Sequence, residues 1–152
     1  MPVTAALRPA VAEDRSRIRQ LLDDAGLPTQ DLGAAAIPDF TDFIVATDAG
    51  EVVGTVAIEA HGGHGLLRSL VVDPAWRGRG LGRALVAAAE ANAAGRRHAS
   101  LTLLTQTAAD WFRTLGYRDI PREQAASSLQ ASAEFSHLCP GSSSCLTKSL
   151  RI

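Results

Sequence analysis

The chain has 152 residues, of which 46% are hydrophobic and 20% charged, and its formal net charge is −1. This composition is typical of a globular protein that can bury a core. A nearly neutral chain has no overall electrostatic attraction to nucleic acid or to a membrane surface. It also lacks the start of a signal peptide and an apolar run long enough to span a membrane. We therefore expect one soluble, cytoplasmic domain over residues 1–152.

The first elements predicted along the chain are a strand over residues 4–8, ended by Pro9, and a helix over residues 12–25. Apolar side chains recur along that helix at helical spacing, and Gly26 and Pro28 end it. Residues 27–39 contain two prolines and small side chains, and no element is assigned to them from the pattern alone.

A hairpin is predicted next, with strands over residues 40–47 and 52–58 and a turn at residues 48–50. Gly54 lies inside the second strand, which predicts a bulge or a close approach of another backbone segment. Residues 61–65, with three glycines, are expected to form a mobile connection.

The most informative stretch is a strand over residues 66–72, a turn at Asp73 and Pro74, a glycine-rich segment and a helix that we expect to end at Gly95. A charge within an apolar strand is costly without a partner, so Arg68 requires a salt bridge, an exposed face or a substrate carboxylate. Strand alternation predicts that Ser69 points to the opposite face from Arg68.

The glycine-rich segment has the chemistry of an anion site. The first amides of a helix have no internal acceptor and carry the positive end of the helix dipole. Glycines let an anion approach the backbone, and Arg77 and Arg79 offer forked donors that suit phosphate. The order of strand, glycine-rich turn and helix therefore predicts a pyrophosphate site. A solvated turn and an Arg-Gly RNA-binding tract are the alternatives.

After this helix we expect a strand over residues 101–104, a helix over residues 108–115 that ends at Gly116, and a strand over residues 117–120. Helical segments are expected from Pro121 onward and near residues 132–138, followed by a last strand over residues 145–150. Strands with helices inserted between them predict an α/β protein with a mixed sheet.

Two familiar phosphate motifs are excluded at the glycine-rich segment. Gly82 is followed by Arg83 and Ala84 rather than the Lys-Ser/Thr of a Walker loop, and the third glycine of the dinucleotide motif is missing. The pattern that does fit is Arg-x-x-Gly-x-Gly, at Arg77, Gly80 and Gly82. It resembles the coenzyme A signature of the GNAT N-acetyltransferases. The opening at residues 7–14 and the aromatic motif at residues 111–117 resemble the same family.

The GNAT resemblance implies a mixed, splayed central sheet flanked by helices, with acetyl-CoA as co-substrate and a small-molecule amine as acceptor. It implies that backbone groups of Leu70, Val71 and Val72 bind the pantetheine arm. The residues implied in pyrophosphate binding are Arg77, Gly78, Arg79, Gly80, Leu81 and Gly82. Many family members place at the position of Phe112 a tyrosine that protonates the leaving thiolate, so that acid is absent here.

The remaining candidates for proton transfer are weak. Tyr117, the only tyrosine, falls at the structural aromatic position of the family motif. Glu59, His61 and His64 lie beside the central strand, and histidine titrates in a suitable range. Solvated histidines and a chain of water molecules are at least as plausible as a dedicated base.

The C-terminal segment, including residues 134–140 and 146–150, resembles the ArsN-type arsenic-resistance acetyltransferases and, more distantly, N-acetylglutamate synthases. The first resemblance implies acetylation of the α-amine of arsinothricin, a glutamate mimic. The second implies glutamate N-acetylation for arginine biosynthesis. Either acceptor needs cationic and hydroxyl partners, for which Arg8, Arg68 and Thr105 are candidates. A non-catalytic acyl-CoA sensor is the alternative from another class.

Cys139 and Cys145 are too few for a disulfide framework or a closed zinc site, so no metal site is expected. The sequence leaves a homodimer open.

Overall fold

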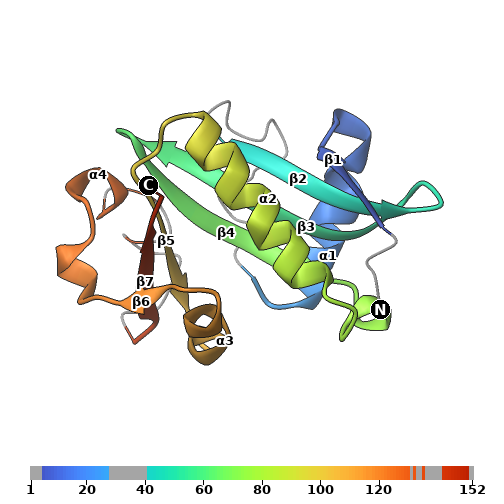
Figure 1. Ribbon diagram of the computed structural model, residues 1–152. Coiled ribbons are helices and arrows are strands. Elements are labelled where there is room, and N and C mark those ends of the chain that lie inside the picture. Colours follow the sequence, from blue (N-terminus) through green and yellow to red (C-terminus); the bar gives the residue numbers. More distant parts are fainter. Residues whose placement is uncertain (1–4, 28–40, 131, 133–134, 136–141, 151–152) are drawn as a thin grey trace.

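Seven strands form one mixed sheet that carries helices on both of its faces (Figure 1). The computed structural model describes residues 5–27, 41–130, 132, 135 and 142–150. The strands are β1 (Ala6–Pro9), β2 (Thr41–Asp48), β3 (Glu51–His61), β4 (His64–Val72), β5 (Ser100–Thr105), β6 (Arg118–Asp119) and β7 (Ser144–Ser149). The α-helices are α1 (Arg15–Asp24), α2 (Leu81–Gly95), α3 (Ala109–Thr114) and α4 (Ser127–Gln130). The predicted α/β class is confirmed.

The order of the strands in the sheet is β1-β2-β3-β4-β5-β7-β6. Every neighbouring pair is antiparallel except β4 and β5, which run parallel. That parallel pair is held by Cα partners at Gly65 with Leu101 and at Leu66 with Thr102. Beyond Leu66 the two strands diverge (Figure 1), so the predicted splayed sheet is confirmed.

Both long helices hold β4 and its neighbours from opposite faces. On one face, α2 buries a stripe of apolar side chains against β2, β3 and β5. This stripe consists of Leu81, Leu85, Val86, Ala89 and Ala93. On the other face, α1 buries Ile18, Leu21 and Leu22 against Val71 of β4 and apolar residues of β2 and β3. Burying a side chain of this kind contributes roughly 1.5–3 kcal/mol. The C-terminal end of β4 is therefore a rigid support for a site.

The connection between β3 and β4 differs from the prediction. We expected residues 61–65 to be mobile, but the two strands continue to His61 and His64, which are Cα partners. A two-residue turn joins them, with Gly62 at φ 57° and Gly63 at φ 83°. Glycine reaches these left-handed angles without a steric cost, and such turns match the twist of a hairpin. Glu59 and His61 therefore lie on a paired strand.

A bulge interrupts β4 just before its C-terminal end. Thr55 is the Cα partner of Val71, whereas Ala57 is the partner of Arg68, so two residues of β4 lie opposite one residue of β3. Ser69, in the bulge, has φ 59°, which is unusual for a residue other than glycine. A bulge of this kind breaks the alternation of side chains and redirects them, often beside active sites.

Several other boundaries differ from the predicted ones. Gly95 is the last residue of α2 and does not cap it, and the left-handed residue that follows the helix is Arg97, at φ 63°. Gly54 confirms the expected close approach of a backbone, because a Cβ there would lie 3.3 Å from the Val71 carbonyl oxygen. The predictions for residues 28–39 and for most of residues 132–138 lie outside the described part of the chain.

Candidate active site

A cavity of about 680 Å³ lies where β4 and β5 diverge. Residues 67–72 of β4 form one wall, and residues 103–108, at and after the end of β5, form another. Residues 25–27, which follow α1, also line it, together with Trp111 and Phe112 of α3 and Ser143 immediately before β7. Segments far apart in the sequence, from the end of α1 to the start of β7, thus line one cavity.

The wall formed by β4 offers backbone hydrogen-bonding groups to this cavity. In the described part of the chain, β4 pairs with β5 only at Gly65 and Leu66, so its edge is unpaired further on. Leu70, Val71 and Val72 lie along that edge and line the cavity. Unpaired backbone amides and carbonyls need partners, which an extended ligand with amide groups can supply. The arrangement is suited to the pantetheine arm that the sequence implied.

A second hollow of about 260 Å³ lies over the glycine-rich segment. It shares Val72, Arg77, Gly82 and Trp111 with the larger cavity, so the two adjoin. Gly78 has φ 79° and Gly80, the N-cap of α2, has φ 81°. These left-handed angles explain why both positions are glycine.

The smaller hollow has the electrostatics of an anion site. The N-terminal amides of α2 open toward it, because residues 80–83 belong to its lining. Arg77 and Arg83 also line it and add positive charge. The Arg79 guanidinium lies over the Trp76 ring, 4.6 Å from the ring centroid. These residues fit the pyrophosphate of coenzyme A, with backbone donors, a helix dipole and arginines together.

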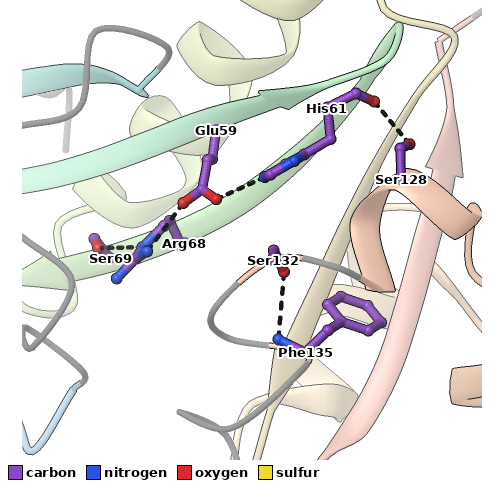
Figure 2. Close-up of polar contacts among 7 residues, drawn as sticks. All are labelled: Glu59, His61, Arg68, Ser69, Ser128, Ser132 and Phe135. Atoms are coloured by element: carbon purple, nitrogen blue, oxygen red, sulfur yellow. Dashed lines mark hydrogen bonds and ion pairs between the residues drawn. The ribbon is translucent and has the colours of Figure 1, made fainter.

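Arg68 forms a buried network with Glu59 and His61 at the edge of the larger cavity (Figure 2). Arg68 is 3% exposed and Glu59 is 4% exposed. Arg68 Nη1 donates to Glu59 Oε2 at 3.0 Å, and His61 Nε2 lies 2.6 Å from Glu59 Oε1. One carboxylate therefore contacts both basic side chains. The ion pair offsets the cost of burying each charge.

The bulge brings Ser69 into the same network. Arg68 Nε donates to Ser69 Oγ at 3.3 Å, and both residues line the cavity. The predicted opposite orientation of these side chains is thus wrong, because the bulge breaks the alternation. Ser128 of α4 donates to the His61 carbonyl at 3.0 Å and ties α4 to the end of the hairpin (Figure 2).

Tyr117 lies in the core, outside the described lining of the cavity. The residue is 3% exposed, and its hydroxyl donates to Glu90 Oε2 of α2 at 3.0 Å. Lys148 of β7 donates to both oxygens of the same carboxylate at 3.1 Å. Burial, followed by the nearby Glu90 charge, raises the pKa of Tyr117 well above its ordinary value. A hydroxyl held in this way is a poor proton donor to a ligand in the cavity.

Phe112, at the position where the GNAT resemblance implies a tyrosine in many family members, does line the cavity. It packs edge-on against Trp111, with ring centroids 4.9 Å apart, and against Tyr117 at 5.4 Å. The ring supplies an apolar wall and no proton.

Three other predicted residues have identified local partners. His64 Nδ1 lies 3.2 Å from Ser100 Oγ, at the turn of the hairpin. Arg8 pairs with Asp14 at 2.7 Å and is not among the described residues that line the cavity. Thr105 does line it, and its hydroxyl accepts from the Ala108 amide at 3.0 Å.

Cys145 is a free, buried cysteine, and burial raises the pKa of its thiol to about 11. A thiol of that kind is a weak nucleophile and a weak metal ligand at neutral pH. Within the described residues, no group of histidine, cysteine and acidic side chains is arranged to hold a metal ion. Cys139 lies outside that part of the chain.

Sequence reasoning did not identify Ser143, Ala25 or Gly26 as part of the cavity. Ala25 and Gly26 stand at the end of the predicted helix, and nothing in their composition marks them as lining a cavity. Ser143 is one of three consecutive serines, of which only the one that precedes β7 by a single residue faces the cavity.

The diverging parallel pair and the adjoining glycine-rich hollow define an α/β protein with a site for an extended, phosphorylated cofactor. The family model for the acetyltransferase (GNAT) domain matches residues 39–119, more than half of the chain. The chain therefore belongs to the GNAT acetyltransferase family, whose members use acetyl-CoA as co-substrate. No protein with a curated description matches the sequence.

Solved structures share the fold at low identity. N-acetylglutamate synthase from Neisseria gonorrhoeae, complexed with coenzyme A and N-acetyl-glutamate, is 19% identical, with a TM-score of 0.83. That comparison covers 100% of this chain but only 36% of the synthase, so this chain spans about a third of that enzyme.

Two smaller proteins match over nearly their whole length. One is a protein of Mycobacterium tuberculosis, Rv2747, in complex with coenzyme A, at 24% identity and a TM-score of 0.79, covering 96% of this chain and 99% of the other. The second, from Klebsiella pneumoniae, is described as a putative acyl-CoA N-acyltransferase, at 24% identity and a TM-score of 0.72, covering 97% and 99% of the two chains. No helix in the described residues is long and apolar enough to cross a membrane.

Proposed function

We propose that this domain transfers the acetyl group of acetyl-CoA to the α-amine of a small acidic amino acid, either glutamate or a glutamate mimic such as arsinothricin. One observation carries the choice of acceptor. Arg68, a buried cation, lies in the wall of the cavity that adjoins the glycine-rich hollow. A guanidinium in a site of low dielectric pairs with a carboxylate through short, charge-assisted hydrogen bonds.

In the proposed reaction the neutral amine attacks the thioester carbonyl directly. The pyrophosphate binds over the start of α2, and the pantetheine arm binds along β4. A backbone amide near Leu70–Val72 stabilises the oxyanion as negative charge develops on it. Holding the amine and the thioester together supplies much of the rate. Water takes up the proton that the amine loses as the C–N bond forms. Because Phe112 cannot donate a proton and Tyr117 is bound to Glu90, water also returns a proton to the leaving thiolate.

Glutamate itself is the second candidate acceptor. This chain shares its fold with a synthase that was solved in complex with N-acetyl-glutamate, and this favours glutamate as the acceptor. At 19% identity the likeness is one of fold alone. The arsinothricin assignment is supported by the resemblance of the C-terminal segment alone. Both acceptors have an α-amine, an α-carboxylate and an acidic end group, so Arg68 has the same role with each.

The test is release of coenzyme A thiol from acetyl-CoA, with the protein's own cysteines blanked. The panel contains arsinothricin, phosphinothricin, glutamate, aspartate, a polyamine and a lysine peptide. Turnover confined to the acidic amino acids supports the proposal. Turnover of the polyamine or the peptide alone would contradict the acceptor class.

Two arginine variants then separate the acceptor from the cofactor. Arg68→Lys keeps the charge but loses the fork, so kcat/KM for the acidic amino acid should fall by about tenfold or more, with KM for acetyl-CoA unchanged. Arg83→Gln, in the glycine-rich hollow, should raise KM for acetyl-CoA and leave acceptor preference intact. If Arg68→Lys changed only KM for acetyl-CoA and Arg83→Gln changed acceptor preference, the acceptor would bind elsewhere.

A further inference from the structure

Ser143 has a buried hydroxyl that no group in the described part of the chain satisfies. The residue is 8% exposed, and its Oγ has no hydrogen-bond partner among residues 5–27, 41–130, 132, 135 and 142–150. A serine hydroxyl can donate one hydrogen bond and accept two. Leaving such a group buried and unsatisfied costs free energy that an alanine would not cost. The Ser143 hydroxyl therefore does not contribute to the stability of the folded domain.

The same residue lines the larger cavity. It immediately precedes β7, whose first residue, Ser144, is the Cα partner of Thr105 at the end of β5. The contrast with Thr105 is informative, because the Thr105 hydroxyl already accepts from the Ala108 amide. An unsatisfied hydroxyl in a cavity wall is expected where a bound ligand supplies the missing hydrogen-bond partner.

Arg68 and Ser143 approach the cavity from two different strands. Arg68 belongs to β4 and Ser143 adjoins β7, and β5 lies between those strands in the sheet. Neighbouring strands are about 4.8 Å apart, so strands two places apart are separated by roughly 10 Å, and more where they diverge. Backbones that far apart favour contact of the two residues with different groups of a ligand. An acceptor that contacts both needs a second polar group several bonds from the first.

We propose that Ser143 determines acceptor specificity by donating a hydrogen bond to an oxygen-bearing group at the end of the acceptor side chain, such as a carboxylate, a phosphinate or an amide. This role rests on the proposed function, and it assigns the α-carboxylate of the acceptor to Arg68. Because the hydroxyl is neutral, it requires an acceptor oxygen on the ligand but not a negative charge. A site with a buried polar group rejects analogues that leave this group unpaired, so an apolar side chain of the same shape should be a poor acceptor.

The experiment compares glutamate with homoleucine, in which an isopropyl group replaces the side-chain carboxylate. The ratio of their kcat/KM values is measured for the wild type, for Ser143→Ala and for Ser143→Thr. We expect the wild type to favour glutamate, Ser143→Ala to lose about tenfold of this preference or more, and Ser143→Thr to keep most of it. KM for acetyl-CoA should be the same in all three proteins.

Ser144→Ala is the matched control, because Ser144 is the adjacent serine and does not line the cavity. It should keep the wild-type preference. Thermal unfolding provides a second readout: Ser143→Ala should be at least as stable as the wild type, since it removes an unsatisfied hydroxyl.

The outcomes separate the two proposals. An unchanged glutamate preference in Ser143→Ala, with glutamate still acetylated, overturns the role of Ser143 alone. Equal loss of preference in Ser144→Ala also overturns it. A wild type that acetylates no α-amino acid overturns the proposed acceptor class, and the role of Ser143 with it.

Discussion

Arg68 Nη1 lies 3.0 Å from Glu59 Oε2, and the two residues come from neighbouring strands of one hairpin. Glu59 is the Cα partner of Leu66, so Arg68 is its diagonal neighbour on the adjacent strand. Diagonal neighbours are within reach of long side chains. The pair keeps a charge buried at the cavity wall and fixes the direction of its guanidinium. If Arg68 binds the acceptor as proposed, stability and acceptor recognition depend on the same two residues.

Removing one partner should leave a buried charge without its counter-ion. We expect Glu59→Ala to lower the free energy of unfolding by about 3 kcal/mol, measured by urea denaturation. The double variant Glu59→Leu/Arg68→Met should recover most of that loss, because two apolar residues need no counter-ion. It should nevertheless fail to acetylate an acidic amino acid while still binding coenzyme A. A fully stable Glu59→Ala protein would show that the pair is not needed to keep Arg68 buried.

The glycine-rich segment could be predicted from the sequence because its physics is local. A strand, a turn and a helix with glycines at fixed positions indicate a helix N-terminus open to an anion, and Gly78 and Gly80 have the positive φ angles that this geometry needs. The hairpin at residues 48–50 is local for the same reason, with Ala49 at φ 51° and Gly50 at φ 83°.

The sequence predicted a salt bridge as one partner for Arg68, and the structure confirms one. The sequence did not identify Glu59 as the partner, because the pairing depends on register. Had Gly62 and Gly63 been recognised as a two-residue turn, the pairing of His61 with His64 would have followed, and with it the diagonal contact of Glu59 and Arg68. The bulge at Ser69 had no such signal, since serine is uncommon at positive φ. It decides which side chains of β4 reach the cavity, and tertiary packing alone sets it.

Gly80 should be sensitive to substitution for a backbone reason. At φ 81° an alanine would be strained by roughly 1 kcal/mol, and relief of this strain would move the first amides of α2. We expect Gly80→Ala to raise KM for acetyl-CoA and to lower the melting temperature. Gly95→Ala is the matched control, since Gly95 is helical and a Cβ there meets nothing within 4 Å. It should be neutral or slightly stabilising, with unchanged kinetics. Similar kinetic effects of both variants would contradict a role for the Gly80 conformation.

The Arg8–Asp14 pair should act on stability rather than on catalysis. Asp14 accepts from the Val11 amide at 2.8 Å and from Arg8 at 2.7 Å. Hydrogen bonds from Arg8 hold the pKa of Asp14 below its ordinary value. A carboxyl whose folded pKa is depressed contributes stability above its unfolded pKa, about 3.9, and this contribution is lost as the pH falls through the folded value.

We therefore expect Asp14→Asn to lower the free energy of unfolding at pH 7 by up to about 1 kcal/mol, because the amide keeps an acceptor for the Val11 amide but loses the ion pair with the partly exposed Arg8. The difference from the wild type should shrink below about pH 4, measured by urea denaturation across a pH series. Arg8→Gln should leave KM for the acceptor unchanged. A rise in that KM, with normal stability, would instead support the prediction that Arg8 binds the substrate.

Tyr117→Phe tests whether the only tyrosine takes part in proton transfer. Its hydroxyl donates to Glu90, and Glu90 also binds Lys148, so the change removes one hydrogen bond from a structural cluster. We expect a loss of about 1 kcal/mol in the free energy of unfolding and little change in kcat. If Tyr117 were the general acid, Tyr117→Phe would instead lower kcat by about a hundredfold or more.

Phe112→Tyr is the informative companion, because it places a hydroxyl in the cavity wall, where the GNAT resemblance implies one in many family members. If water protonates the thiolate in the unchanged protein, Phe112→Tyr should keep kcat or raise it. A large fall in kcat for Tyr117→Phe alone would instead show that Tyr117 is the acid.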